Sequence, residues 1–236
     1  IESHNSIREM QEKPNDQFGH MKRNLIAGIR KTHKYVENHK VSDYLVPYTS
    51  SGCTAMCLYC YLVCNYNKCA YLRLFVNREQ MLDRIIKKGK NSGTPLTFEI
   101  GSNSDLVLEN TITGNLLYTI PRFAEEGEGK LTFPTKFHMV EPLLDLDHRG
   151  KVIFRMSVNP QPIIRKIELG TSGLKQRIEA VNQMCEAGYP CGLLIAPVIL
   201  VEGWKEMYTG LLEELRDGLS DKMKSQMFLE IILMTY

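Results

Sequence analysis

The chain alternates between short apolar stretches and longer stretches in which apolar residues recur with helical spacing. The apolar stretches have the length and composition of buried strands. They cover residues 44–48, 96–100, 130–133, 151–157, 192–198 and 228–234. One helical stretch follows Asn77, which suits an N-cap, and others cover residues 111–125, 139–147, 174–187 and 204–219. This alternation predicts βαβ units and a parallel sheet.

The order of the predicted strands along the chain limits how the sheet can close. We expect a partial (β/α)6-type TIM barrel of parallel strands, with a doubly wound open sheet as the alternative. Residues 71–76 also alternate and predict a further extended segment. Residues 1–24 are polar and lack periodicity, which predicts a poorly ordered arm. We therefore expect an N-terminal arm and edge segment over residues 1–40 and a barrel domain over residues 41–236.

Composition and charge exclude several classes of protein. The formal charge is 29 − 27 = +2, so no global field points to nucleic acid, and such a partner would need a local basic patch. No signal peptide is recognisable, and no apolar run is long enough to predict a membrane span. The seven cysteines are odd in number and crowded, which argues against a disulfide scaffold and favours a reducing cytoplasm. We assign Cys185 and Cys191 to core packing.

Three of the cysteines, Cys53, Cys57 and Cys60, lie in one short loop with the spacing C-x3-C-x2-C. The predicted strand of residues 44–48 delivers the chain to this loop. A zinc site usually takes a C-x2-C pair from one loop and finds its other two ligands elsewhere, so a zinc knuckle is the alternative interpretation. Three close thiolates without a matching fourth favour a four-iron cluster whose remaining iron is left open for a ligand.

Small polar residues recur where the predicted strands end, and parallel barrels collect their chemistry at these ends. In chain order the strand ends carry Ser102, Asn103, Ser104 and Asp105, then Lys136, then Ser157 and Asn159, then Ala196 and Pro197. Any one of these residues alone would be interpreted as a helix cap or a turn former. As a set they predict the wall of a site for a polar, zwitterionic ligand.

Several longer motifs occur in an order that resembles one family in particular. They are SGCTAMCLYCYL and YLRLFVN within residues 51–77, FEIGSNSD from Phe98, FPTKF from Phe133, FRMSVN from Phe154, GTSGLKQRIEA from Gly170 and AGYPCGLLIAPVILVEGW from Ala187. From residue 25 to residue 236 the chain is similar to the spore photoproduct lyases, which are radical S-adenosylmethionine (AdoMet) enzymes. The resemblance implies a DNA repair enzyme in the cytoplasm of a spore-forming cell.

The resemblance also implies cofactors and a reaction. Cys53, Cys57 and Cys60 would hold a [4Fe–4S] cluster. The AdoMet site would be lined by Tyr59, Ser104, Lys136, Ser157, Asn159 and the backbone at Ala196. A 5′-deoxyadenosyl radical would take a hydrogen from C6 of 5-thyminyl-5,6-dihydrothymine, the spore photoproduct. The methylene bridge between the bases would then break, and two thymines would result.

The product radical needs a hydrogen donor, and the cysteine that the family usually employs is replaced in this chain. Its position, two residues before the serine of the family's C-T-S-D motif, is Ser102, whose O–H bond is too strong for this role. We expect the donor to be Cys64 or Cys69, and we favour Cys64 because a helical turn would place it on the face of Tyr61. Tyr61 matches a family tyrosine that relays the hydrogen. The alternative is that both thiols are structural.

The expected partners are ultraviolet-damaged DNA, with the thymine lesion flipped out, and a reductant such as flavodoxin or ferredoxin. We expect a monomer with no membrane partner, and we expect the family's C-terminal DNA-gripping segment to be missing. Some basic residues could contact phosphates, although each is first interpreted as a solvated surface charge: Lys87, Lys88, Lys90, Arg122, Arg149 and Lys151. Alternative functions are a radical AdoMet enzyme acting on another nucleotide, peptide or RNA substrate, and a non-catalytic iron–sulfur or zinc binding protein.

Overall fold

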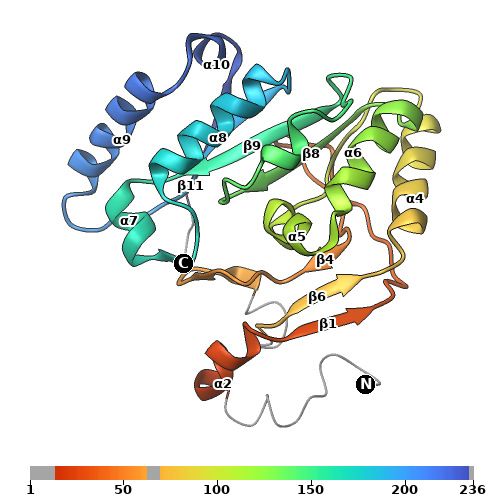
Figure 1. Cartoon of the computed structure of the whole chain (residues 1–236), viewed down its shortest axis with the longest axis horizontal. Coiled ribbons are helices and arrows are strands. Elements are labelled where there is room, and N and C mark those ends of the chain that lie inside the picture. Colours follow the sequence, from red (N-terminus) through yellow and green to blue (C-terminus); the bar gives the residue numbers. More distant parts are fainter. Residues whose placement is uncertain (1–13, 63–69, 234–236) are drawn as a thin grey trace.

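A computed structural model of the chain describes residues 14–62 and 70–233. Its main sheet has seven strands in the order β12-β11-β9-β8-β7-β3-β2 (Figure 1). The strands are β2 (Val36–Glu37), β3 (Tyr44–Leu45), β7 (Thr97–Glu99), β8 (Lys130–Thr135), β9 (Val152–Val158), β11 (Cys191–Val198) and β12 (Phe228–Leu233). The neighbouring pairs from β12 to β3 are all parallel, and β2 lies antiparallel to β3 at one edge.

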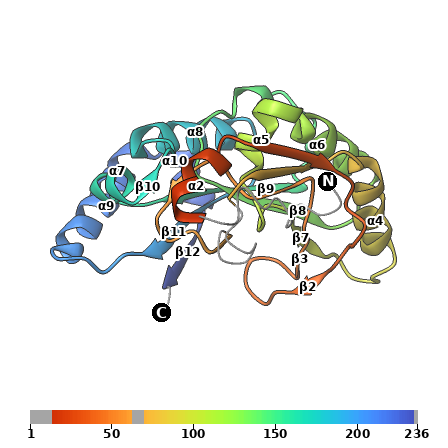
Figure 2. The same cartoon turned by 90° about the horizontal axis from the view of Figure 1, so that it is seen from below.

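The six parallel strands are the six that the apolar stretches predict. Figure 2 shows the sheet as an arc with helices along its outer side. This arrangement confirms the expected partial barrel and excludes the doubly wound sheet, which would carry helices on both faces.

The strand register separates two kinds of side chain onto the two faces of the sheet. Phe98, Phe133 and Phe154 share one face and are fully buried on the side that α5 and α8 contact. Glu99 and Arg155 share the opposite, concave face, where they line a cavity. One face therefore forms the hydrophobic core, and the other is available for a site.

The helices follow the strands as the alternating pattern predicts. They are α2 (Pro14–Met21), α4 (Arg78–Lys90), α5 (Leu106–Thr113), α6 (Asn115–Glu126), α7 (Gln161–Lys166), α8 (Leu174–Glu186), α9 (Trp204–Gly218) and α10 (Asp221–Gln226). The expected helices after Asn77 and over residues 174–187 and 204–219 correspond to α4, α8 and α9. Within the described ranges, no helix combines the length and apolar character that a membrane span requires.

The single helix expected over residues 111–125 is wrong, because the structure has two helices, α5 and α6, in its place. Gly114 separates them with left-handed backbone at φ 63° and ψ 22°. The first helix also begins earlier than expected, because the Asp105 carboxylate accepts a hydrogen bond from the Leu108 amide at 3.2 Å. A glycine and an N-cap residue thus override the apolar periodicity.

The helix expected over residues 139–147 is also wrong, since the segment forms only the 3-10 turn η1 (Glu141–Leu143). Val140 and Leu143 are fully buried and hold one turn against the core. The chain then reverses at Arg149 and Gly150, both with positive φ, to enter β9.

A small second sheet lies beside the main one, in the order β1-β6-β4. Its strands are β1 (Leu25–Gly28), β4 (Ser50–Ser51) and β6 (Leu72–Phe75). The extended segment expected over residues 71–76 is β6. Asn77 does occupy the N-cap position of α4, but its side chain makes no capping hydrogen bond to the helix backbone and contacts the Arg30 backbone. It accepts from the Arg30 amide at 2.9 Å and donates to the Arg30 carbonyl oxygen at 3.1 Å.

The N-terminal segment contains regular structure where it is described. The expectation of an arm without structure over residues 1–24 is wrong for α2, while residues 1–13 lie outside the described part of the chain. Met21 is fully buried and packs with Ala70 and Tyr71. These partners are distant in sequence, so the local polar composition gave no sign of them.

Candidate active site

A cavity of about 470 Å³ opens on the concave side of the sheet, at the carboxyl ends of the parallel strands. It joins the cysteine loop to the ends of β7, β8, β9 and β11. Residues singled out from the sequence that line it are Cys53, Cys57, Cys60, Tyr59, Tyr61, Ser102, Ser104, Asp105, Lys136, Ser157, Ala196 and Pro197. Asn159 is fully buried beside this lining. Tertiary structure therefore brings together the residues that the strand-end pattern selects.

The cysteine loop begins with a glycine that no other residue could replace without strain. Gly52 has φ 83°, and a Cβ atom at this position would lie 2.6 Å from the carbonyl oxygen of Tyr71. The next residue, Cys53, is held through its backbone, because the Lys22 ammonium donates to its carbonyl oxygen at 2.7 Å. The first cysteine is thus held by the backbone turn at Gly52 and by the hydrogen bond from Lys22 to its own carbonyl oxygen.

The middle of the cysteine loop is held by a short antiparallel pairing. β5 (Met56–Cys57) pairs with β10 (Glu168–Leu169), so Cys57 lies opposite Glu168. The Leu58 amide extends this pairing by donating to the Ile167 carbonyl oxygen at 2.9 Å. A segment distant in sequence therefore positions the loop between its second and third cysteines.

The three loop thiols fit an iron–sulfur cluster as a donor set. None of them is in a disulfide. Burial, with a smaller effect of the Asp105 carboxylate, raises the pKa of the Cys53 thiol to about 12, and burial also raises the pKa of Cys57. Among the described residues, no three His, Cys, Asp or Glu side chains converge on one metal-ion position. The thiolates that hold an iron–sulfur cluster bind different irons, so they need not converge on one point. The absence of a position for a single metal ion in the described part of the chain is therefore compatible with a cluster.

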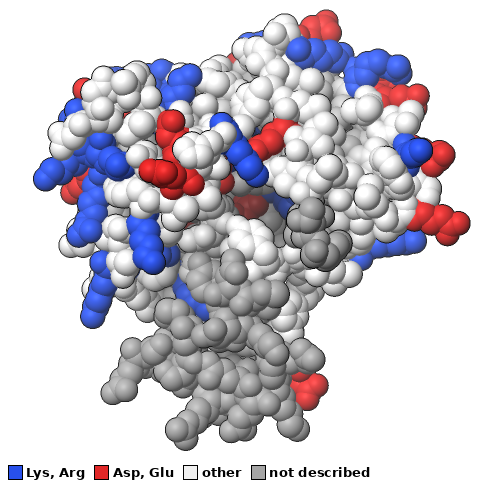
Figure 3. Space-filling model, turned by 180° about the vertical axis from the view of Figure 1, so that it is seen from behind, with Lys and Arg blue, Asp and Glu red and all other residues white. Residues whose placement is uncertain are grey.

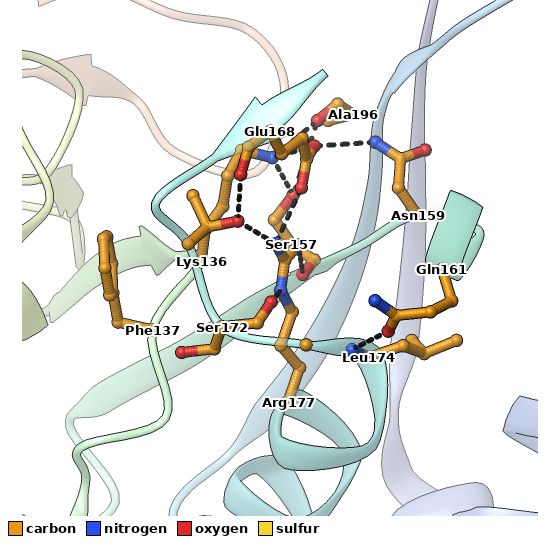
Figure 4. A network of polar contacts seen from close by, with 12 residues as sticks. Lys136, Phe137, Ser157, Asn159, Gln161, Glu168, Ser172, Leu174, Arg177 and Ala196 are labelled. Carbon is orange, nitrogen blue, oxygen red and sulfur yellow. Dashed lines mark hydrogen bonds and ion pairs between the residues drawn. The ribbon is translucent and has the colours of Figure 1, made fainter. Parts of the chain in front are cut away.

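Lys136, at the end of β8, is the centre of a polar wall beside the cysteine loop (Figure 4). Its ammonium donates to Ser157 Oγ at 2.5 Å, to the Ala196 carbonyl oxygen at 2.9 Å and to Glu168 Oε1 at 3.0 Å. The Ala196 carbonyl can accept because the β11–β12 ladder is interrupted between Ile195 and Val198. Burial lowers the pKa of Lys136, and the Glu168 carboxylate opposes this effect.

Glu168 connects the polar wall to the cysteine loop, and the sequence analysis did not identify it. Its Oε1 accepts from the Tyr59 hydroxyl at 2.5 Å, from Lys136 and from the Asn159 amide at 2.8 Å. Its Oε2 accepts from Arg177 at 2.7 Å. Burial favours the neutral acid, but the two cations lower the pKa of Glu168 to about 2. Its position two residues before the GTSG motif was the available signal.

Arg177, near the start of α8, is fully buried behind the wall. Besides Glu168, its guanidinium donates to the Ser172 and Ser157 carbonyl oxygens at 2.8 and 3.0 Å and to the Thr171 hydroxyl at 2.7 Å. Within this cluster the two cations Lys136 and Arg177 share the one carboxylate of Glu168, and the Lys136 ammonium lines the cavity. A cation at the cavity surface favours a ligand with an anionic group.

The end of β7 contributes in two ways. Asp105 accepts from the Thr135 hydroxyl at 2.8 Å and from the Lys136 amide at 2.9 Å, so the N-cap of α5 also holds the end of β8. Ser104 lines the cavity, and its hydroxyl shares a 2.5 Å hydrogen bond with that of Ser50. Ser104 therefore lies apart from the Lys136 network on the same cavity.

The residues expected to return hydrogen to the product are only partly placed by the structure. The Tyr61 hydroxyl donates to the Ser102 carbonyl oxygen at 2.5 Å, so these two predicted residues are in contact. Cys64 and Cys69 lie outside the described residues, and their assignment stays a prediction.

A second buried charge network lies deeper on the concave face and was not predicted from the sequence. The Arg155 guanidinium contacts Glu99 at 2.5 Å and Glu230 at 3.2 Å, and its Nε donates to the Thr132 hydroxyl at 2.9 Å. Burial raises the pKa of Glu99, and Arg155 opposes this effect. All three charged residues line the cavity, so its floor is charged as well as its wall.

Comparison with known proteins shows the family of this chain. The family model described as spore photoproduct lyase matches residues 1–236. A spore photoproduct lyase of Bacillus subtilis (strain 168) is 38% identical over 232 residues, which cover 98% of this chain and 68% of that protein. The spore photoproduct lyase of Geobacillus sp. (strain Y412MC61) is 32% identical over 232 residues, with the same coverage of both chains.

Solved structures agree with the sequence relatives. A mutant spore photoproduct lyase with bound AdoMet and dinucleoside spore photoproduct matches with a TM-score of 0.86 at 31% identity. The match covers 92% of this chain and 64% of that one. This chain thus spans about two thirds of the length of the relatives it matches.

Proposed function

The chain belongs to the spore photoproduct lyase family, and on this basis we propose that it reverts 5-thyminyl-5,6-dihydrothymine to two thymines. The observation that carries the proposal is the cavity at the strand ends. Three cysteines of one loop line it together with Tyr59 and a polar wall centred on Lys136.

The expected enzyme class, a radical AdoMet carbon–carbon lyase, and the expected cofactors are confirmed by the family match and the AdoMet-bound relative. We assign the [4Fe–4S] cluster to Cys53, Cys57 and Cys60, because the three thiols line one cavity and none is oxidised. When bound, cluster and AdoMet supply a carbon-centred radical that takes hydrogen from the substrate.

The polar wall supplies binding and orientation for a zwitterionic cofactor. We assign its anionic end to the side of the cavity where the Lys136 ammonium lies, with Ser157, Ala196 and Tyr59 as neighbouring contacts. Asn159 acts behind the lining, since its amide donates to Glu168 and its carbonyl accepts from the Tyr208 hydroxyl. We also assign a cofactor contact to Ser104, which follows β7 and lines the same cavity.

Hydrogen return to the product is assigned to Tyr61 and one cysteine, with Cys64 favoured over Cys69. The Tyr61 hydroxyl is held at Ser102, the position where the usual cysteine of the family is replaced. Single replacements of Cys64 and Cys69 by alanine test the assignment. The donor variant should form abortive thymine products, and normal repair by both variants would contradict it.

The DNA partner must be bound at the mouth of the cavity, because a thymine lesion has to leave the base stack to reach it. The six basic residues singled out from the sequence are poorly placed for this. Lys87, Lys88 and Lys90 end α4, which leads into the amino end of β7, and Arg149 and Lys151 precede β9. The carboxyl ends of the strands, where the cavity opens, are at the opposite end of the barrel.

At least four of the six also have partners within the chain, including Arg149, which pairs with Asp147 at 3.1 Å, and Lys88, whose ammonium lies over the Tyr44 ring. Arg122 pairs with Asp83 and Glu126 at 2.5 and 2.9 Å, and the Lys151 ammonium donates to two backbone carbonyl oxygens. Figure 3 shows Lys and Arg side chains spread over the face opposite that of Figure 1, with Asp and Glu among them. We assign the phosphate contacts instead to Arg165 and Lys166, which are exposed and directly precede the β10 pairing with the cysteine loop.

The decisive experiment is anaerobic. The reconstituted chain is reduced and given AdoMet and a dinucleotide spore photoproduct, and thymine dinucleotide and 5′-deoxyadenosine are followed by chromatography. Repair is the expected result. Formation of 5′-deoxyadenosine without repair would support the radical chemistry but overturn the assignment of the substrate. The substrate would then be another nucleotide, a peptide or RNA. If neither product forms although the cluster is intact, the enzymatic assignment is overturned.

The reductant and oligomeric state are assigned from the family as well. We propose a one-electron donor of the flavodoxin or ferredoxin type and a monomeric enzyme. Replacing a chemical reductant by reduced flavodoxin or ferredoxin in the same assay tests the donor, and sedimentation tests the monomer.

A further inference from the structure

One buried carboxylate, that of Glu168, links parts of the site that are far apart in the sequence. A single oxygen, Oε1, accepts hydrogen bonds from Tyr59 in the cysteine loop, Lys136 at the end of β8 and Asn159 after β9. Glu168 is only 1% exposed, whereas Tyr59 and Lys136 line the cavity. It therefore lies one layer behind the cavity surface and acts through the residues that form it.

The backbone around Glu168 holds the same loop as its side chain. Glu168 pairs with Cys57 across the two short strands, and the Ile167 carbonyl oxygen accepts from the Leu58 amide at 2.9 Å. Backbone and side chain thus contact residues on either side of Leu58. The loop is held between the second and third cysteines by one segment.

The carboxylate is itself fixed from behind. Its second oxygen accepts from Arg177, whose remaining donors contact Ser157, Thr171 and Ser172 (Figure 4). With both oxygens engaged by donors from four residues, rotation of the carboxylate would leave buried donors without acceptors. The position of Glu168 is therefore determined by the fold before any ligand binds.

We propose that Glu168 is a positioning residue that holds the cysteine loop and the polar wall in one arrangement before the cofactors bind. Identifying the ligands as a cluster and AdoMet rests on the proposed function, but the holding contacts do not. The role requires a carboxylate, because an amide offers one acceptor oxygen and would turn an NH2 group toward other donors.

The test compares Glu168→Gln with the wild-type chain by hydrogen exchange, without cluster. The reporters are the amides of Leu58 and Cys60, which donate to Ile167 and Cys57. We expect at least tenfold faster exchange over residues 54–60, with exchange in α4 unchanged. After reconstitution, the Kd for AdoMet should rise at least tenfold. Glu168→Asp keeps the charge and should recover part of both effects.

Leu82→Ala is the matched control for a general loss of stability. Leu82 is fully buried in α4, which lies at the opposite edge of the fold from α7 and α9 in Figure 1. This variant should speed exchange in α4 and leave residues 54–60 no faster than the rest of the chain. The proposal is overturned if Glu168→Gln exchanges over residues 54–60 like the wild type, or no faster there than Leu82→Ala.

Further measurements cover two cases: a Glu168→Gln variant that does not fold, and a wild-type chain that does not repair the lesion. If Glu168→Gln does not fold, Tyr59→Phe removes only one of the hydrogen bonds and should still speed exchange over residues 54–60, and no effect would overturn the proposal. If the wild type fails to repair the lesion while Glu168→Gln loosens the loop, the proposed function fails and the positioning role stands.

Discussion

The Asp105 carboxylate accepts a hydrogen bond from the Lys136 amide at 2.9 Å. The same carboxylate caps α5 through the Leu108 amide and accepts from the Thr135 hydroxyl. Asp105, the cap residue that follows β7, thereby holds Lys136, the centre of the polar wall that follows β8. Residues at strand ends can be interpreted as helix caps or as parts of a ligand site. Asp105 serves both purposes, because it caps α5 and holds the backbone at Lys136.

Replacing Asp105 by alanine should lower the free energy of unfolding by about 1–3 kcal/mol, because the cap is lost and buried donors are left unpaired. It should also weaken AdoMet binding, since the backbone at Lys136 loses its anchor. Urea denaturation and equilibrium dialysis measure the two effects. Ser220→Ala removes the cap of α10, where the hydroxyl accepts from the Met223 amide at 3.2 Å, and should cost stability without changing AdoMet affinity. Equal AdoMet affinities in both variants would refute the coupling.

Replacing Gly52 by alanine should destabilise the start of the cysteine loop and reduce the iron bound after reconstitution. The positive φ costs about 1 kcal/mol or more for any L side chain, and the Cβ would also collide with the Tyr71 carbonyl oxygen. Gly93→Ala is the control, because Gly93 has φ 71° but nothing within 4 Å of the added atom. Iron content and thermal unfolding distinguish the two. If both variants lose the same amount of iron and thermal stability, the effect comes from the backbone strain at positive φ and not from the collision with Tyr71.

The stability contributed by Glu168 should depend on pH in a defined window. Lys136 and Arg177 lower its pKa to about 2, against an ordinary value of 4.5, despite the opposing effect of burial. Between these values the unfolded chain binds more protons than the folded one, so this contribution is complete above about pH 4.5 and is lost toward pH 2. The difference in unfolding free energy between wild type and Glu168→Gln, measured by urea denaturation without cluster, should shrink across this window. A difference that stays constant would contradict the assigned ion pairs.

Neutralising Arg165 and Lys166 by glutamine should weaken binding of a lesion-containing duplex and lower the slope of log K against log salt by about 1–2. The matched control neutralises Lys87 and Lys90, two exposed lysines at the opposite end of the barrel. Fluorescence anisotropy over a range of salt concentrations measures both variants. A larger effect of the control pair would place the DNA on the other end of the barrel and overturn the assignment.

The sequence by itself determined the features that depend on neighbouring residues. Short apolar stretches predicted the six parallel strands, because a buried strand needs apolar side chains among its own residues. The spacing of Cys53, Cys57 and Cys60 predicted one loop of thiols, and the strand-end rule selected Lys136, Ser157 and Ala196 for one wall. Gly114 shows the limit of periodicity, since one left-handed residue divided an apparently continuous helix.

Only the tertiary structure decided which distant residues meet. Glu168 lies in a two-residue strand with no pattern of its own, and its importance comes from four donors supplied by separate elements. Arg155 likewise reaches Glu99 and Glu230 across the concave face. Such contacts depend on how the sheet curves and which strand ends adjoin. Buried charges are tolerated only where the fold supplies partners, and sequence periodicity does not encode that long-range requirement.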